Sequence, residues 1–524
     1  MNRIRQTLNK YIGSGLLAIF TIIGIWNFSS YGIAWDEPTQ RAIGYMSWGY
    51  VLRMNDKLPT FYDRDYGVAF EMPLVALEKA LLIDNHQAYE AHRMRHLASH
   101  LFFLIGAFFC FLLVDYLYRS KWLAALAFLF IVLQPRLYAH SFFNSKDIPF
   151  MSMFFICFYL LAKALHERKN IQFILLGVSV ALLINLRLAG IIMIVVVFSV
   201  LLIDSILYKS KRSIIIANGK SFILFFATSA LVLYITWPFL WAHPIDNFAY
   251  AFRNMSNFRW GAAILFNEQM IPTPKLPWYY ILEWFSISTP IVFVALGATG
   301  LVLICIAFIK SNFSIFKNRL EQQTVVYAIC FGSPIILVIL LHSVVYGDWR
   351  HLYFVYAPFV MLVVYALNYF IKTKLKWIAL SGVLFTFCSV SLFMIKQAPY
   401  QHIYFNSLVD SKTPEYLYSQ FELDYWGVSY KESLEYIINN DLDSTISIAV
   451  QSYPGVFNQF SLNDKDRGRL KYVSDWREAK YYIAQYIDPK ERANPNWQKW
   501  FSVKVANNTI SSVYKIRPPS ITQP

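Results

Sequence analysis

Charge is scarce in this chain of 524 residues. Only 15% of the residues are Asp, Glu, Lys or Arg, whereas about a quarter are charged in a typical soluble domain. Hydrophobic residues make up 57% and gather in runs of about 17–25, the length that a helix needs to cross about 30 Å of hydrocarbon. This composition excludes an ordinary soluble protein and predicts an α-helical polytopic membrane protein.

Cysteine is equally sparse, and its placement is uninformative for redox chemistry. The five cysteines, Cys110, Cys157, Cys305, Cys330 and Cys388, all lie in apolar runs. Residues 395–524 contain none. The sequence therefore indicates neither a disulfide framework nor a cysteine-based zinc site.

Acidic residues are too few to balance the basic ones, so the formal net charge is +15. The excess does not indicate a nucleic-acid surface. Residues 395–524 hold 15 Lys and Arg against 14 Asp and Glu, and in residues 1–394 the basic residues sit largely between apolar runs. Basic residues in that position set membrane topology, and nucleic acid is not expected as a partner.

Eleven membrane-spanning helices are predicted from the apolar runs. They cover roughly residues 12–31, 99–118, 122–138, 148–165, 171–186, 188–207, 221–240, 281–309, 324–344, 352–371 and 376–394. With the N-terminus in the cytoplasm, six basic segments become cytoplasmic, and they contain only two acids, Glu167 and Glu321. This agrees with the positive-inside rule. The first run lacks a small-residue cleavage site, so we expect a retained helix.

Two domains are expected. Residues 1–394 would form the transmembrane domain, with a long first extracytoplasmic loop at 32–98, and residues 395–524 a small extracytoplasmic α/β domain. In that tail, "SYKESLEYIINN" predicts a helix whose capping box is Ser429 and Glu432. "STISIAV", "AKYYIAQYI", "FSVKVA" and "SSVYKIR" predict strands. The Trp- and Pro-rich segment 237–280 is predicted to lie at the membrane interface.

The first loop opens with an acidic pair, Asp36 and Glu37, in "YGIAWDEPTQ". Such a pair can cap the following helix, with Pro38 in its first turn. Carboxylates at a membrane boundary are costly to desolvate, however, and usually face a partner or a cavity. The pair is therefore a candidate catalytic site.

A second acidic site lies between the third and fourth runs, in "HSFFNSKDIPF". A helix start accounts for Asp147, which is followed by a proline. It leaves Lys146 and His140 unexplained. We take Asp147 as a candidate catalytic residue, and His140 and Asn144 as further site candidates.

Isolated arginines follow on the same predicted face. They are Arg93, Arg95, Arg136, Arg187 and Arg350. Arginine suits a phosphate because its planar fork makes two parallel hydrogen bonds. Taken singly, each could instead be an interfacial anchor that extends toward lipid headgroups. Together with two carboxylate sites, they predict one charged face.

Three histidines, His92, His96 and His100, recur at helical spacing. That spacing permits a metal site, because side chains at i and i+4 are neighbours. Hydrogen bonding at the interface is the alternative, and we favour it. No metal ligand is assigned, and a divalent cation is left open.

The motifs "WDEP" and "HSFFNSKDIPF", in a chain with a long first loop and an acidic second loop, resemble the GT-C superfamily of membrane glycosyltransferases. Within it the sequence is similar to the protein O-mannosyltransferase-like group and the lipid A aminoarabinose transferases. The likeness covers residues 1–400 in layout, and the tail adds only "FELDYWG". It implies transfer of one sugar from a polyprenyl-phosphate donor to an acceptor hydroxyl on a glycan, lipid or protein, away from the cytoplasm.

Carried over by position, the resemblance makes Asp36 the catalytic aspartate of the first loop, Glu37 its companion and Asp147 the second-loop acid. The chemistry of the residues agrees, because Asp36 can act as the general base for an acceptor hydroxyl, and a single displacement of this kind would invert the sugar. The residues expected to contact the donor phosphate are Arg93, Arg95, Lys146, Arg187 and Arg350. Membrane lipids are the other expected partners, and the expected location is a bacterial inner membrane.

Two other functions are compatible with a charged polytopic membrane protein. A transporter or lipid flippase also uses intramembrane charges, but the charges here gather on one face, and no paired broken spans suggest inverted repeats. A non-catalytic scaffold gives no reason for Asp36, Lys146 and Asp147 to coexist. The sequence therefore favours the glycosyltransferase.

Overall fold

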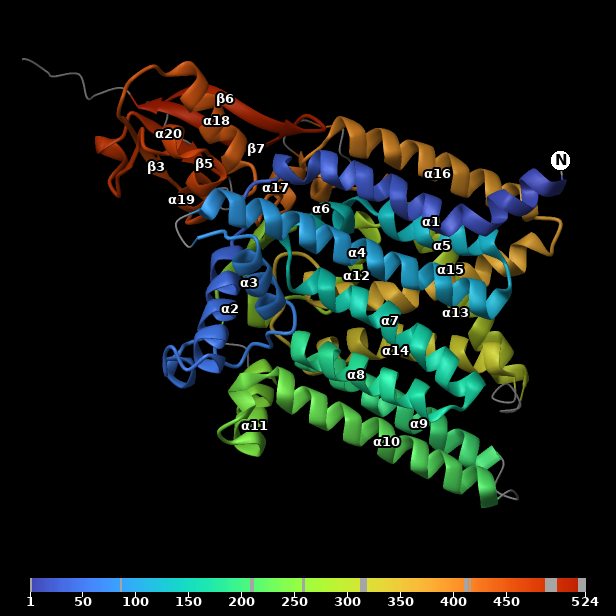
Figure 1. Cartoon of the computed structure of the whole chain (residues 1–524). Helices are drawn as coiled ribbons and strands as arrows, with labels where there is room; N and C mark the ends of the chain where they lie inside the picture. The colour runs from blue at the N-terminus through green and yellow to red at the C-terminus, as the bar shows by residue number, and fades with distance from the viewer. Residues whose placement is uncertain are drawn as a thin grey trace, which may run out of the picture.

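The computed structural model describes residues 2–84, 87–207, 212–256, 260–311, 318–409, 413, 416–485 and 497–516. Long helices lie side by side in one bundle. A strand-containing C-terminal domain sits at one end of the bundle, where α2, α3 and α11 also gather (Figure 1). The N-terminal end of α1 lies toward the opposite end.

The bundle is formed by helices of very different length. They are α1 (Asn2–Asn27), α4 (Ala88–Tyr118), α5 (Lys121–Val132), α6 (Pro135–Phe143), α7 (Asp147–Glu167), α8 (Asn170–Leu186), α9 (Ile192–Leu207), α10 (Arg212–Thr236), α12 (Tyr280–Ser288), α13 (Ile291–Lys310), α14 (Arg319–Leu340), α15 (Tyr356–Ile371) and α16 (Lys376–Lys396). Within the described residues, nine stretches are long and apolar enough to cross a membrane, or ten with the bent α5–α6 pair. The 17-residue α8 matches the remaining predicted run.

Two of the predicted spans are broken by proline. The run predicted at 122–138 is bent by 66° between α5 and α6, because Pro135 begins a new helix after an extended Gln134. The run predicted at 281–309 was wrong at its start. Thr289 is extended and Pro290 precedes the first turn of α13, so the span begins at Ile291 and α12 is a separate short helix.

Two of the basic segments meet at one end of the bundle. Arg168, after α7, and Arg319, at the start of α14, both pair with the buried Asp204 of α9. Because α7 begins at Asp147 and is 21 residues long, this ion cluster lies about 30 Å from the start of α7. The arrangement agrees with basic segments on one side, whose cellular location stays a prediction.

The long connections build the other end of the bundle. The first loop contains α2 (Glu37–Val51) and α3 (Glu71–Ala80). Segment 237–280 contains α11 (Pro244–Ser256) and an antiparallel hairpin of β1 (Ala263–Phe266) and β2 (Gln269–Pro272). Sequence analysis did not predict this hairpin. A six-residue 3-10 helix, η7 (Arg350–Val355), leads into α15.

The C-terminal domain is a five-stranded sheet in the order β4-β3-β5-β7-β6. Its strands are β3 (Ile446–Val450), β4 (Leu470–Tyr472), β5 (Tyr481–Ala484), β6 (Trp497–Val505) and β7 (Asn508–Ile516). The parallel pairs β3–β4 and β3–β5 adjoin an antiparallel β5–β7–β6 part. The four predicted strands are confirmed where the structure describes them; residues 486, 487 and 517 of the predicted segments lie outside the described residues. The hairpin between β6 and β7 turns through Ala506 and Asn507, both at positive φ.

The predicted helix of this domain is α18 (Tyr430–Asn440), but its capping box was wrong. The backbone N–H of Ser429 already donates to Asp424 Oδ2, at 2.9 Å, so Glu432 cannot take it. Glu432 instead accepts a hydrogen bond from the Tyr400 hydroxyl. The Ser429 side chain makes no capping hydrogen bond.

Candidate active site

Three residues far apart in the sequence converge where α2, α7 and η7 begin. Arg350 Nη1 lies 3.1 Å from Asp36 Oδ2 and 3.7 Å from Asp147 Oδ2. Arg187, in the turn between α8 and α9, donates to Asp147 Oδ1. Both predicted carboxylate sites therefore share one guanidinium. The two acids also lie at helix starts, where the helix dipole favours negative charge.

Asp147 is buried, and both oxygens of its carboxylate accept hydrogen bonds. Its residue is 1% exposed, and besides Arg187 it accepts a hydrogen bond from Asn144 Nδ2 at 3.0 Å. Asn144 Oδ1 in turn accepts the Asp147 backbone N–H at 2.9 Å. Asp147 therefore holds arginines in place, and Asn144 orients Asp147.

Asp36 differs from Asp147 in its exposure. Its side chain is 29% exposed, whereas the side chain of Arg350 is only 3% exposed. One oxygen of Asp36 is thus engaged by a buried, fixed cation while the carboxylate stays reachable from outside. A carboxylate in this state can accept a proton from a molecule that docks against it.

Lys146 completes the positive side of the cluster. Its Nζ lies 3.9 Å from the centre of the Tyr66 ring. Burial, helped by Arg187, lowers the pKa of Lys146 to about 8, although Asp36 and Asp147 act in the opposite direction. The ammonium is therefore present at neutral pH and is lost under mildly alkaline conditions.

Aromatic rings surround the Arg350 guanidinium. Its Cζ lies 4.7 Å from the ring centres of Tyr346 and Trp426, and 5.4 Å from that of Tyr425. Such cation–π contacts offset part of the cost of burying the charge. Tyr425 and Trp426 belong to the C-terminal domain and to the segment "FELDYWG". Sequence analysis noticed the segment but did not assign these residues to the site.

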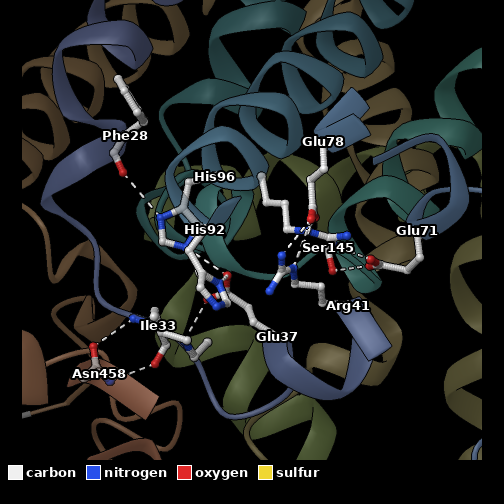
Figure 2. A network of polar contacts seen from close by, with 12 residues as sticks. Phe28, Ile33, Glu37, Arg41, Glu71, Glu78, His92, His96, Ser145 and Asn458 are labelled. Carbon is white, nitrogen blue, oxygen red and sulfur yellow. Dashed lines mark hydrogen bonds and ion pairs between the residues drawn. The ribbon is translucent and has the colours of Figure 1, made fainter. Parts of the chain in front are cut away.

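Glu37 lies next to Asp36 in the chain, and its side chain points toward His92 and His96 (Figure 2). It accepts hydrogen bonds from the Ala34 backbone N–H at 2.7 Å and faces His92 Nδ1 at 3.3 Å and His96 Nε2 at 3.0 Å. Burial alone would raise the pKa of Glu37, but His96 and His92 together lower it to about 2. The structure therefore separates the two members of the acidic pair.

Arg95 and Arg93 also contact other groups. Arg95 binds Glu71 at 2.6 Å and Glu78 at 2.5 Å. Glu78 additionally binds Arg41 (Figure 2). Arg93 Nη1 donates to the Tyr89 hydroxyl at 3.2 Å. The structure thus brings Lys146, Arg187 and Arg350 to the carboxylates, but not these two arginines.

A second buried acid, Asp348, adjoins the site and was missed in the sequence. It accepts hydrogen bonds from Arg136 Nη1 at 2.9 Å and from the Tyr353 hydroxyl at 3.1 Å. Burial raises the pKa of Asp348 to about 6, although Arg136 opposes this. The Tyr353 hydroxyl also lies 3.4 Å from Nε2 of His140. The buried His140 is thereby linked to the turn "YGDWRH" that delivers Arg350.

The three histidines considered as metal ligands do not converge. His92 and His96 contact Glu37, whereas His100 Nδ1 contacts Ser141 Oγ at 2.7 Å. Across the described part of the chain, no group of three or more His, Cys, Asp or Glu side chains is arranged to hold a metal ion. Participation of a divalent cation stays a prediction.

Comparisons with known proteins place the fold. No protein-family model matches the sequence, and a search of curated proteins found no match. Among solved structures, ArnT from Cupriavidus metallidurans in the apo state is similar over 98% of this chain and 100% of that one, with a TM-score of 0.50 and 10% identity. The apo oligosaccharyltransferase of Archaeoglobus fulgidus is similar over 90% of this chain, with a TM-score of 0.48 and 11% identity. This chain spans 65% of the length of that oligosaccharyltransferase. The chain therefore shares its overall fold with that ArnT structure.

Proposed function

We propose that the protein is a membrane glycosyltransferase, which moves a single sugar from a polyprenyl-phosphate donor to an acceptor hydroxyl with inversion. The observation that carries this proposal is the pairing of a partly exposed Asp36 with the buried Arg350 and Asp147. A fixed carboxylate beside fixed cations, at the end of a GT-C bundle, is what transfer from a phosphate-linked sugar requires.

Asp36 is the general base in this reaction. The acceptor oxygen attacks the anomeric carbon and gives its proton to the free oxygen of Asp36. The bond between that carbon and the phosphate oxygen breaks, and the polyprenyl phosphate leaves with the bonding electrons. A base within hydrogen-bond reach typically contributes about 10²–10⁴-fold to the rate. One displacement inverts the sugar and needs no second carboxylate across the bond.

Lys146 and Arg187 bind the donor phosphate. The Arg187 side chain is 20% exposed and Lys146 is half-buried, so both can reach a ligand beside Asp36. They stabilise the charge that grows on the phosphate as it leaves, in a site whose donors are already oriented. The buried Arg350 holds Asp36, and the buried Asp147 holds Arg187 and Arg350.

Glu37, Arg93 and Arg95 have supporting roles in this proposal, because their contacts lie with other residues of the protein. We place the reaction on the extracytoplasmic side of a bacterial inner membrane, with the N-terminus in the cytoplasm. The meeting of two basic segments about 30 Å away, at the opposite end of the bundle, supports that orientation.

The proposal is tested by sugar transfer in proteoliposomes. Purified wild type, Asp36→Asn and Asp56→Asn are incubated with radiolabelled single-sugar polyprenyl phosphates and a membrane extract. Asp56 is a matched control, because it is an exposed acid of the same first loop. We expect wild type and Asp56→Asn to move label alike, and Asp36→Asn to be slower by about 10²–10⁴-fold.

Equal rates for Asp36→Asn and the wild type would remove Asp36 as the base. No transfer by the wild type from any donor, together with measurable movement of lipid across the liposome bilayer, would favour the transporter instead.

A further inference from the structure

The C-terminal domain makes hydrogen bonds to the backbone of Ile33 and Trp35, directly before Asp36 in the chain. The Asn458 side chain, which is fully buried, accepts the Ile33 N–H at 2.8 Å and donates to the Ile33 carbonyl at 2.9 Å. Figure 2 shows Asn458 facing Ile33 in this way. A side-chain amide that pairs with both backbone groups of one residue acts as a neighbouring strand would.

The next two residues are held as well. The Ala34 N–H donates to Glu37, and the Trp35 N–H donates to the Trp426 carbonyl at 3.2 Å. Each backbone N–H from residue 33 to residue 35 thus has a fixed acceptor, and two of the three acceptors belong to the C-terminal domain. The position of Asp36, the next residue, follows from these bonds.

Gly32 allows the two parts of the chain to come this close. A Cβ atom at this position would lie 2.6 Å from Asn458 Oδ1 and would also overlap the Val428 carbonyl oxygen. Such separations are too short for real atoms, so any larger residue would push the C-terminal domain away from the first loop.

The same part of the C-terminal domain also covers Arg350, the partner of Asp36. The ring of Trp426 lies against the guanidinium, while the carbonyl of Trp426 accepts the Trp35 N–H. Its loop is itself fixed, because Asp424 accepts the backbone N–H groups of Val428 and Ser429. The loop that contains Trp426 therefore contacts both the segment that leads to Asp36 and the side chain of Arg350.

We infer that the C-terminal domain completes the active site, with Asn458 and Trp426 as positioning residues for Asp36 and Arg350. This inference rests on the proposed function. It assigns to the domain a role in the rate of sugar transfer, besides any role in stability. A displacement of about 1 Å in a catalytic group can cost about 10²-fold in rate, so a loosened grip should be measurable.

The test compares Asn458→Ala with Asn406→Ala in the full chain. Asn406 is a matched control, because it is a buried asparagine of the same tail that binds two carbonyls at the end of α12, Ser286 and Thr289. We expect kcat of Asn458→Ala to fall by about 10–100-fold, with the KM for the donor unchanged. Asn406→Ala should keep the wild-type kcat. Amide hydrogen exchange at Ile33 should accelerate in Asn458→Ala alone.

Equal losses of kcat in the two alanine variants, or a wild-type kcat in Asn458→Ala, would overturn the inference. If Asn458→Ala does not fold, Trp426→Leu and Trp426→Phe take its place. Phe retains an aromatic face for Arg350, so it should restore the kcat that Leu loses, and two equal wild-type rates would contradict the inference. If the wild type transfers no sugar at all, the proposed function fails, and exchange at Ile33 still reports whether Asn458 holds the first loop.

Discussion

Two clusters of acids and arginines lie at the same end of the molecule and differ in how much of their side chains is exposed to solvent. In one, Arg95 sits between Glu71 and Glu78, and these three side chains are at most 5% exposed. In the other, Arg350 joins Asp147 to an Asp36 that is 29% exposed. The first cluster uses its charges to join α3 to α4. The second leaves a carboxylate and nearby cations within reach of a ligand, so exposure, more than residue type, distinguishes the cluster that we propose to be reactive from the structural one.

Among changes that leave Asp36 in place, the largest expected effect follows from removing the shared cation of the open cluster. Arg350→Gln should lower kcat by about 10²–10³-fold, because Asp36 loses its fixed partner and Asp147 faces one arginine fewer. Arg350→Lys keeps the charge but lacks the fork, so we expect an intermediate rate. Steady-state transfer from the labelled donor measures both. A wild-type kcat for Arg350→Gln would show that the open cluster is not the reactive one.

The closed cluster should respond in stability. Arg95→Gln leaves the buried Glu71 without its arginine and leaves Glu78 with Arg41 alone, and we expect a loss of about 3–5 kcal/mol in the free energy of unfolding. Denaturant unfolding in detergent measures this loss. The folded fraction should keep a kcat close to that of the wild type. If kcat falls while stability does not, Arg95 belongs with the reacting groups.

Lys146 predicts the pH dependence of the open cluster. Burial lowers its pKa to about 8, so the ammonium is present below that pH and is lost as the pH rises through it. We expect kcat/KM for the donor to fall about tenfold between pH 7 and pH 9. Lys146→Arg should flatten this alkaline limb, because arginine stays charged. An alkaline limb that is unchanged in Lys146→Arg would assign the titration to another group.

The smallest effect is expected at Arg93, which stacks near Phe28 and Tyr89. Arg93→Ala should cost no more than about 1 kcal/mol of stability, and it should leave the KM for the donor unchanged. Thermal unfolding and donor titration check the two parts. A large rise in KM would return Arg93 to the phosphate-binding residues that its sequence position predicted.

The helices and the two acidic motifs could be predicted from the sequence, because apolar runs and helix starts are local signals. It also indicated that Lys146, Arg187 and Arg350 share a face with the carboxylates. It could not tell that Glu37 turns toward His92 and His96, since neighbours in the chain can point in opposite directions at the start of a helix.

The long-range contacts were equally hidden from the sequence. Asn458 meets Ile33 across 425 residues, and nothing local marks that asparagine as special. Trp426 belongs to the motif-like segment "FELDYWG", but its contact with Arg350 depends on how the C-terminal domain docks. Such contacts arise from tertiary packing, which cannot be predicted from the local pattern of a single sequence.

The configuration of the transferred sugar tests the central claim, which is a single displacement assisted by one open carboxylate. The product made by the wild type from a donor of known anomeric configuration can be examined by proton NMR. A product of opposite configuration to the donor is predicted. A product that retains the configuration of the donor would contradict the claim, because it would require a covalent intermediate on the enzyme and a second displacement.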